Sequence, residues 1–193
     1  ALNFAVDRNS YSAQTNGTDG AAVAIRNTFS PYDLQVGDKQ FGKLVEESLA
    51  KTNSSTWSNV SLADSQNGLY NEEKAKAAFA KAKESLKAEG VEFPIHLDVS
   101  VDQSAKKGVL EASSLKQSIE SVLGAENVVI DIQQLSTDDF DNSSYLAQTA
   151  AQKDFDIYNG GWSADYLDPS SYLDILNVNN GGMLQNIGLE PVS

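Results

Sequence analysis

One short segment of this sequence carries the side chains best suited to hold a ligand. A glycine pair, Gly160 and Gly161, is followed by Trp162 and then by a lone acid, Asp165, beside Tyr166. Paired glycines interrupt regular structure and let the backbone come close to another molecule. An aromatic ring and a carboxylate placed after such a pair predict a recognition site rather than an accident of packing.

The segment must be positioned by the elements on its two sides. Before it, apolar Phe155 and Ile157 alternate with acidic neighbours, which predicts a strand over residues 155–158. After it, Asp168 precedes Pro169. Aspartate is a preferred helix N-cap and proline suits the first helical position, so a new helix is expected to begin there.

From residue 71 onward the pattern alternates between helices and strands. The expected elements are a helix capped by Asn71 and ended by Gly90, a strand over 95–101, a helix over 104–123, a strand over 128–132, a helix from Ser136 to about Gln152, and the strand at 155–158. Strands joined by helical crossovers predict an α/β fold with helices packed on a mainly parallel sheet. Ligands of such sheets bind beyond the carboxyl ends of the strands, where the glycine–tryptophan segment also lies.

The part before residue 71 is less regular. Residues 1–14 are expected to form the end of a helix, 15–37 to be irregular, and 52–69 to be a polar loop. Asp38 is expected to cap a helix that runs to about Lys51. We therefore expect 71–176 to be the α/β folding core, with 15–37 and 52–69 more mobile.

Composition excludes several classes of function. The formal net charge of −13 argues against nucleic acid, because phosphate binding needs clustered Lys and Arg. The chain has no Cys, which rules out disulfides and thiolate metal sites. The single histidine, His96, lies on the polar face of its strand and has no partner ligands at metal-site spacing. No metal and no cofactor are expected.

Two motifs carry a resemblance to a known family. The run Gly161-Trp-Ser-Ala-Asp-Tyr-Leu-Asp-Pro169 resembles the Gly-Trp-x-Ala-Asp-Tyr-x-Asp-Pro segment of the extracytoplasmic peptide-binding proteins of oligopeptide and dipeptide ABC importers. Residues 1–8, Ala-Leu-Asn-Phe-Ala-Val-Asp-Arg, resemble the family's Ala-x-x-Ala-Ile-Asp-Arg helix end. The composition is similar to that of the oligopeptide-binding lipoproteins of Gram-positive bacteria. Since complete members have two lobes, the resemblance implies that 1–193 is a single lobe of a periplasmic-binding-protein-like fold.

The resemblance also implies roles for particular residues. Asp165 would pair with the α-ammonium group of a peptide, to which a carboxylate makes charge-assisted hydrogen bonds. Trp162 would line a side-chain pocket or stack on the ligand backbone. Tyr166 would offer its hydroxyl group to the ligand, and Ser163 is expected to belong to the same binding site. Asn159 stands where some members carry a basic residue, so it offers no charge to a ligand carboxylate. The alternatives are that Asp165 satisfies local backbone amides, Trp162 anchors the core and Tyr166 simply packs.

The implied function is capture of extracellular peptides and their delivery to the permease of a membrane ABC importer, without catalysis. The implied location is outside the cytoplasm, either at the cell surface on a lipid anchor that lies upstream of residue 1 or in the periplasm. Two alternatives remain. One is a lobe for another solute, namely a dipeptide, a sugar or a metal chelate, and the other is a hydrolase that uses Asp165 and Asp168 as its carboxylate pair.

Overall fold

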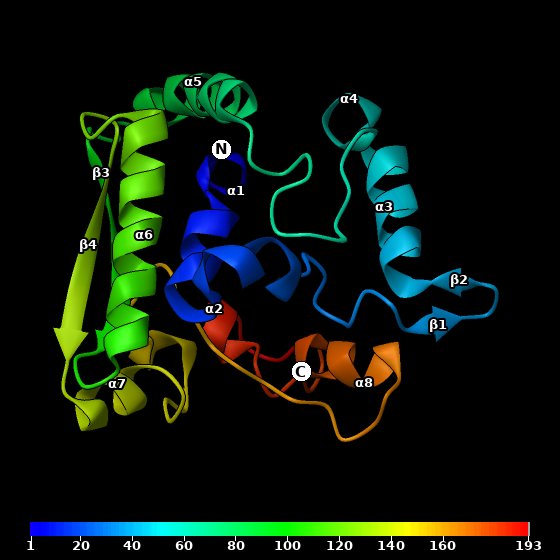
Figure 1. Cartoon of the computed structure of the whole chain (residues 1–193). Helices are drawn as coiled ribbons and strands as arrows, with labels where there is room; N and C mark the ends of the chain where they lie inside the picture. Colours follow the sequence, from blue (N-terminus) through cyan, green and yellow to red (C-terminus); the bar gives the residue numbers. More distant parts are fainter. Residues whose placement is uncertain (193) are drawn as a thin grey trace.

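The chain is organised around a two-stranded parallel sheet. In the computed structural model, which describes residues 1–192, β3 (Ile95–Asp102) pairs with β4 (Val128–Leu135) in register from Ile95 opposite Val128 to Asp102 opposite Leu135. The helix α6 (Lys106–Leu123) connects the two strands and packs along them (Figure 1). The predicted β–α–β unit is therefore confirmed.

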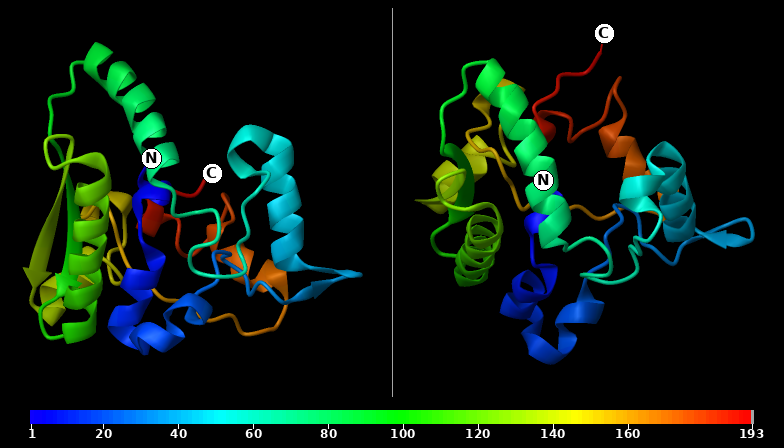
Figure 2. Two further views of the ribbon diagram at one scale, coloured as in Figure 1. Left: turned by 45° about the horizontal axis from the view of Figure 1, so that its top comes forward. Right: turned by 90° about the horizontal axis from the view of Figure 1, so that it is seen from above.

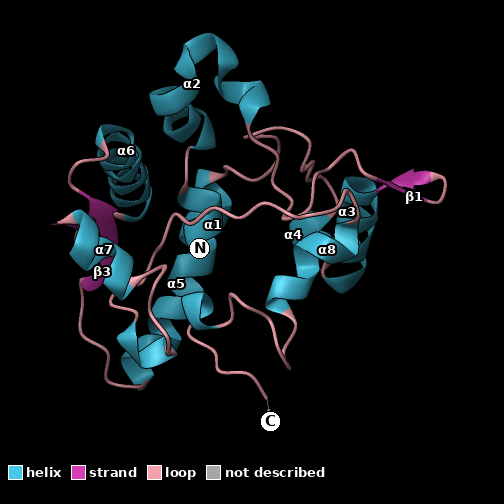
Figure 3. Ribbon diagram, turned by 90° about the horizontal axis from the view of Figure 1, so that it is seen from below, coloured by secondary structure: helices cyan, strands magenta, loops and turns pink. Residues whose placement is uncertain are grey.

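The remaining elements surround this unit. They are α1 (Leu2–Ala5), α2 (Arg8–Ala24), β1 (Gln35–Val36), β2 (Lys39–Gln40), α3 (Phe41–Thr52), α4 (Ser54–Trp57), α5 (Glu72–Ala88), α7 (Thr137–Ser143), η1 (Ala150–Gln152), α8 (Pro169–Leu173), η2 (Asp174–Leu176) and η3 (Gln185–Ile187). The sheet with α6 lies at one end of the molecule, and α3, α4 and the β1–β2 hairpin lie at the other (Figure 2). The helices α1 and α2 lie between the two ends (Figure 3). None of the helices over 1–192 is both long and apolar enough to cross a membrane.

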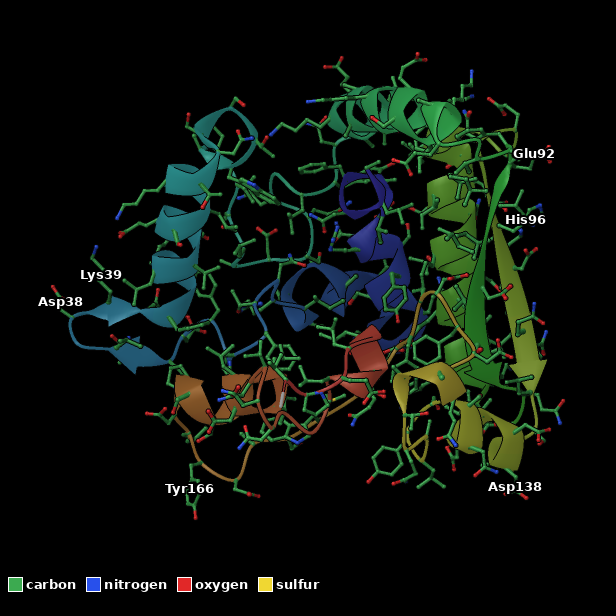
Figure 4. All side chains as sticks on the ribbon, turned by 180° about the vertical axis from the view of Figure 1, so that it is seen from behind. Asp38, Lys39, Glu92, His96, Asp138 and Tyr166 are labelled. Atoms are coloured by element: carbon green, nitrogen blue, oxygen red, sulfur yellow. The ribbon has the colours of Figure 1, made fainter. Side chains whose placement is uncertain are left out.

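The main hydrophobic core follows from the alternation in the two strands. Every second side chain of a strand points to the same face, so the apolar set of each strand is buried together. The buried members are Phe4, Ala5, Ala75, Phe79, Val99, Val101, Ala112, Ile119, Val122, Leu123, Val128 and Ile130. They come from α1, α5, α6 and the sheet, so residues at the very start of the chain help to build this core. His96, on the opposite face, is exposed as predicted (Figure 4).

Local signals placed several helix ends correctly. The Asn71 side chain caps α5 by accepting a hydrogen bond from the Lys74 backbone N–H at 2.9 Å. Gly90, just beyond the same helix, has φ of +83°, a conformation that costs glycine nothing. Ser136 caps α7, and Asp168 caps α8 with Pro169 in its first turn, both as predicted.

Four predictions of secondary structure made from the sequence are wrong. Residues 15–24 are not irregular, because they complete α2, which is kinked at Gly17. Asp38 does not cap α3, whose N-cap is Gln40; it lies in the hairpin turn between β1 and β2. The helix expected to reach Gln152 ends at Ser143. The expected strand at 155–158 makes only one isolated parallel bridge, between Ile157 and Val99.

The segment 52–69, predicted to be a polar loop, contains the short helix α4 and is more firmly packed than its composition indicated. Val60, Leu62 and Leu69 are buried against Tyr32 in a second hydrophobic cluster. One carboxylate oxygen of Glu46, on α3, accepts hydrogen bonds from the Leu62 backbone N–H at 2.7 Å and the Tyr32 hydroxyl at 3.0 Å. How mobile this segment and 15–37 are relative to 71–176 stays a prediction.

Gly42 allows the second cluster to close, and its replacement tests the packing. A Cβ atom at Gly42 would lie 1.9 Å from the buried Tyr32 ring, so the ring must move. We expect Gly42→Ala to lower the free energy of unfolding by about 1–3 kcal/mol, a typical cost of overpacking. Urea denaturation measures this.

The matched control is Gly108, which also lies in a helix. A Cβ atom there meets only the Ala105 Cβ, at 3.9 Å. Gly108→Ala should therefore raise the free energy of unfolding by about 0.5–1 kcal/mol, because alanine is the better helix former. Equal effects of the two substitutions would contradict the proposed contact with Tyr32.

Candidate functional site

The glycine–tryptophan segment leaves the sheet beside β3. The Ile157 backbone N–H donates to the carbonyl oxygen of Asp98 at 3.0 Å, and the Asp156 carboxylate accepts the Asp98 backbone N–H at 2.8 Å. Beyond this attachment the chain crosses the molecule to α8 (Figure 1). At the far end, the buried Ser30 hydroxyl donates to the carbonyl oxygen of Pro169 at 3.2 Å. The segment is thus anchored at both ends and is free of regular structure between them.

Three of the predicted site residues lie together. Trp162, Asp165 and Tyr166 line one pocket of about 570 Å³, with Asp174, Asn177 and Asn180 among the other lining residues. The Trp162 ring meets the ring of Tyr172 edge-on, with 5.8 Å between centroids, and remains 40% exposed. Tyr166 is 74% exposed and projects away from the ribbon (Figure 4). Neither aromatic side chain is a core anchor.

The two neighbouring acids have different surroundings. The Asp168 carboxylate accepts hydrogen bonds from the Ser170 hydroxyl and backbone N–H, and these bonds lower the pKa of Asp168. Asp165 is exposed and makes no hydrogen bond or ion pair with any other residue of 1–192. The capping role that a loop aspartate commonly takes is filled by Asp168, which leaves the Asp165 carboxylate available to an incoming donor.

The other two predicted residues lie apart from that pocket. Ser163 is exposed and does not line it. Asn159 lies at a separate cavity of about 500 Å³ between β3, α2 and α6. Its side-chain N–H group donates to the Tyr11 hydroxyl at 2.5 Å and to a carboxylate oxygen of Glu111 at 3.0 Å. The structure therefore does not bring all five residues into one site.

The contact of Asn159 with Tyr11 and Glu111 is one that the sequence does not predict. Burial and the negative charge of Glu111 raise the pKa of Tyr11 to about 12, so its hydroxyl stays protonated at neutral pH. No local pattern signals the contact, because Asn159 is 148 residues from Tyr11 and 48 from Glu111. Within 1–192, no group of three His, Cys, Asp or Glu side chains is arranged to hold a metal ion.

Comparison with known proteins identifies the class to which this fold and pocket belong. The chain belongs to the bacterial extracellular solute-binding proteins of family 5, since the model for the middle region of that family matches residues 1–183. Among curated relatives, it is 55% identical over 192 residues to the oligopeptide-binding protein AliB of Streptococcus pneumoniae, and 54% identical over 180 residues to AmiA of the same species. These matches cover 99% and 92% of this chain but only 29% and 27% of the relatives. The chain thus spans less than a third of their length.

Solved structures agree on the fold. The chain superposes with a TM-score of 0.62 on a peptide-binding protein of a peptide ABC transporter, at 25% identity, covering 97% of this chain and 67% of the other. It superposes with a TM-score of 0.61 on Listeria monocytogenes OppA bound to peptide, at 19% identity, covering 96% of this chain and 30% of the other. The predicted α/β fold of the periplasmic-binding-protein-like kind is confirmed, as is the predicted family.

Proposed function

We propose that residues 1–193 are one lobe of a longer receptor that captures extracellular oligopeptides and delivers them to a membrane ABC importer. Family membership supports this proposal, as do the relatives of more than 50% identity that are named as oligopeptide-binding proteins. The length of those relatives supports the assignment to a single lobe. The family consists of binding proteins, and we assign no catalytic step to this chain.

The proposal for Asp165 rests on its carboxylate, which has no hydrogen-bond or ion-pair partner in the described part of the chain and lies in an open pocket edged by aromatic rings. Every unmodified peptide presents an α-ammonium group with three N–H donors, whatever its sequence. A single carboxylate can therefore anchor peptides of many sequences through charge-assisted hydrogen bonds. Closure of a second lobe over the pocket would exclude water and strengthen the pair.

Each of the neighbouring residues has its own role in the proposed peptide site. Trp162 supplies a flat surface beside the amine site, and Tyr166 and Ser163 supply exposed hydroxyls along the ligand path. Asn159 is held by Tyr11 and Glu111 and carries no positive charge, so the carboxylate end of the ligand is not neutralised there. The ligand's C-terminus is accordingly held elsewhere in the receptor or left in solvent.

The proposed partners are the peptide and the permease subunits of the importer, with no nucleic acid. The family is extracellular, and we propose attachment to the cytoplasmic membrane through a lipid anchor upstream of this lobe. Delivery would depend on hinge closure, because only the closed, ligand-bound arrangement presents both lobes to the permease together.

A ligand panel tests the proposed function. We expect the full-length receptor to bind oligopeptides measurably in titration calorimetry and not to bind free amino acids, sugars or metal chelates under the same conditions. Saturable binding of a sugar or a chelate without peptide binding would contradict the proposal. So would turnover of a glycoside or ester panel that is lost in Asp165→Asn.

A further inference from the structure

The cavity beside Asn159 is apolar along most of its wall. Its apolar lining residues include Val6, Ile25, Val99, Val101, Leu115 and Ile157. At about 500 Å³ it is large enough for an extended side chain. It lies at the end of β3 where the strand runs into Asp102, the edge of a parallel sheet at which ligands gather.

The charged groups of this wall are already held within the lobe. The Arg8 guanidinium donates to the carbonyl oxygens of Asn3 at 2.9 Å and Val6 at 3.3 Å. The Asp102 carboxylate accepts hydrogen bonds from the Ser104 hydroxyl at 2.7 Å and the Thr137 hydroxyl at 2.9 Å. Arg8 and Asp102 carry opposite charges, so the two together add no net charge to the wall.

Glu111 adds a negative charge that has no ion-pair partner among residues 1–192. Its carboxylate bonds two residues of the cavity wall, Tyr11 at 3.4 Å and Asn159 at 3.0 Å, and also accepts the Thr15 hydroxyl at 2.5 Å. All three donors are neutral, and no Lys, Arg or His among residues 1–192 forms an ion pair with Glu111. A carboxylate has about four lone-pair positions, so there is room for a further donor.

We propose that this cavity, together with Glu111, which is hydrogen-bonded to the wall residues Tyr11 and Asn159, is a specificity pocket that selects a basic side chain, lysine or arginine, of the bound peptide. The aliphatic stem of such a side chain fits the apolar wall, and its charged head reaches the carboxylate. An acidic side chain is disfavoured there, because it meets Glu111 as a like charge in a partly desolvated place.

The inference rests on the proposed function, since the side chain belongs to a peptide whose amine is held at Asp165. Asp165 is six positions from Asn159 in the sequence, a separation that an extended backbone spans in at most about 20 Å. An extended ligand advances about 3.3 Å per residue, so the selected position lies within roughly the first seven residues.

The test uses the full-length receptor and a set of alanine-based heptapeptides. Each peptide carries one lysine, one norleucine or one Nε-acetyl-lysine, placed in turn at every position after the first. Norleucine keeps the apolar stem of lysine without its cation. In titration calorimetry at fixed ionic strength, we expect lysine to bind roughly tenfold more tightly than norleucine and Nε-acetyl-lysine at one position. If the lysine, norleucine and Nε-acetyl-lysine peptides bind the wild-type receptor with equal affinity at every position, the proposal is wrong.

Two matched variants assign the effect to Glu111. Glu111→Gln removes the charge and should reduce the lysine preference to less than twofold, while the norleucine peptide binds as it does to wild type. Asp131→Asn removes the same charge from the outer face of the sheet, where Asp131 contacts His96 at 2.7 Å, and should keep the preference. A preference that survives Glu111→Gln would overturn the assignment. Failure of all peptides to bind would overturn the proposed function as well, whereas binding without a lysine preference overturns this inference alone.

Discussion

Replacement of Asp165 by alanine in the full-length receptor is expected to weaken oligopeptide binding by about 2–5 kcal/mol, roughly 30- to 4,000-fold. The reason is that the closed site would then hold the α-ammonium group of the peptide without its counter-charge. Titration calorimetry of wild type and variant with one peptide measures the difference. The two proteins should have equal unfolding midpoints, because Asp165 is exposed and makes no hydrogen bond or ion pair within residues 1–192.

The ligand supplies the second half of this experiment. An N-acetylated peptide lacks the cation, so it should bind poorly to wild type and lose little more in Asp165→Ala. The four affinities form a double-mutant cycle between protein and ligand, whose coupling term isolates the pair. If acetylated and free peptides bind wild type equally, Asp165 is not the amine anchor.

Asp168 is the matched control for Asp165, since it lies three residues away. Its carboxylate caps α8 through Ser170, so Asp168→Ala should affect the stability of that helix and leave peptide affinity nearly unchanged. A loss of affinity in Asp168→Ala as large as that in Asp165→Ala would contradict the separate roles of the two acids.

The second prediction with a large expected effect concerns the peptide affinity of this lobe without the rest of the receptor. We expect residues 1–193 without the rest of the receptor to bind peptides far more weakly than the full-length receptor. The pocket of Asp165 and Tyr166 is open to solvent, so the charge pair stays in water, where such pairs contribute at most about 1 kcal/mol. Titration with a mixed peptide pool should give no measurable heat at micromolar concentrations.

The control for that titration is the folded state of the isolated lobe. Circular dichroism and a cooperative unfolding transition should show that the lobe is intact before binding is measured. Submicromolar affinity of the isolated lobe would contradict the prediction, because it would mean that the site is complete without a second lobe.

Much of the secondary structure could be predicted from the sequence, because it depends on residues that are close together in the chain. Helix ends depend on a few neighbouring side chains, which is why the Asn71, Ser136 and Asp168 caps follow from residue type and spacing. The alternation in 95–101 and 128–132 predicts strands for a similar reason, since one face of each must be buried. The same local information indicated the order of helices and strands, and hence the parallel pairing of β3 with β4.

Where the local patterns failed, a competing contact was the cause. The strand expected at 155–158 is reduced to one bridge because the Asp156 side chain takes the Asp98 backbone N–H, and Phe155 stacks on Tyr158 at 4.9 Å. The helix α7 stops early because the Ser143 hydroxyl bonds the carbonyl oxygen of Asp139 at 2.8 Å. Serine hydroxyls of this kind compete with the helical hydrogen bonds.

The candidate site was likewise predictable where its residues are adjacent in the sequence and unpredictable where they come together only in the fold. The motif from Gly161 to Pro169 pointed to Asp165 and Trp162 because its residues are adjacent in the chain. Asp168 was identifiable as a helix cap because it precedes Pro169, whereas only the folded structure shows that no donor within residues 1–192 occupies the Asp165 carboxylate. The link from Asn159 to Tyr11 and Glu111 was decided only by the packing of α2 and α6 against β3, which joins residues that no local pattern relates.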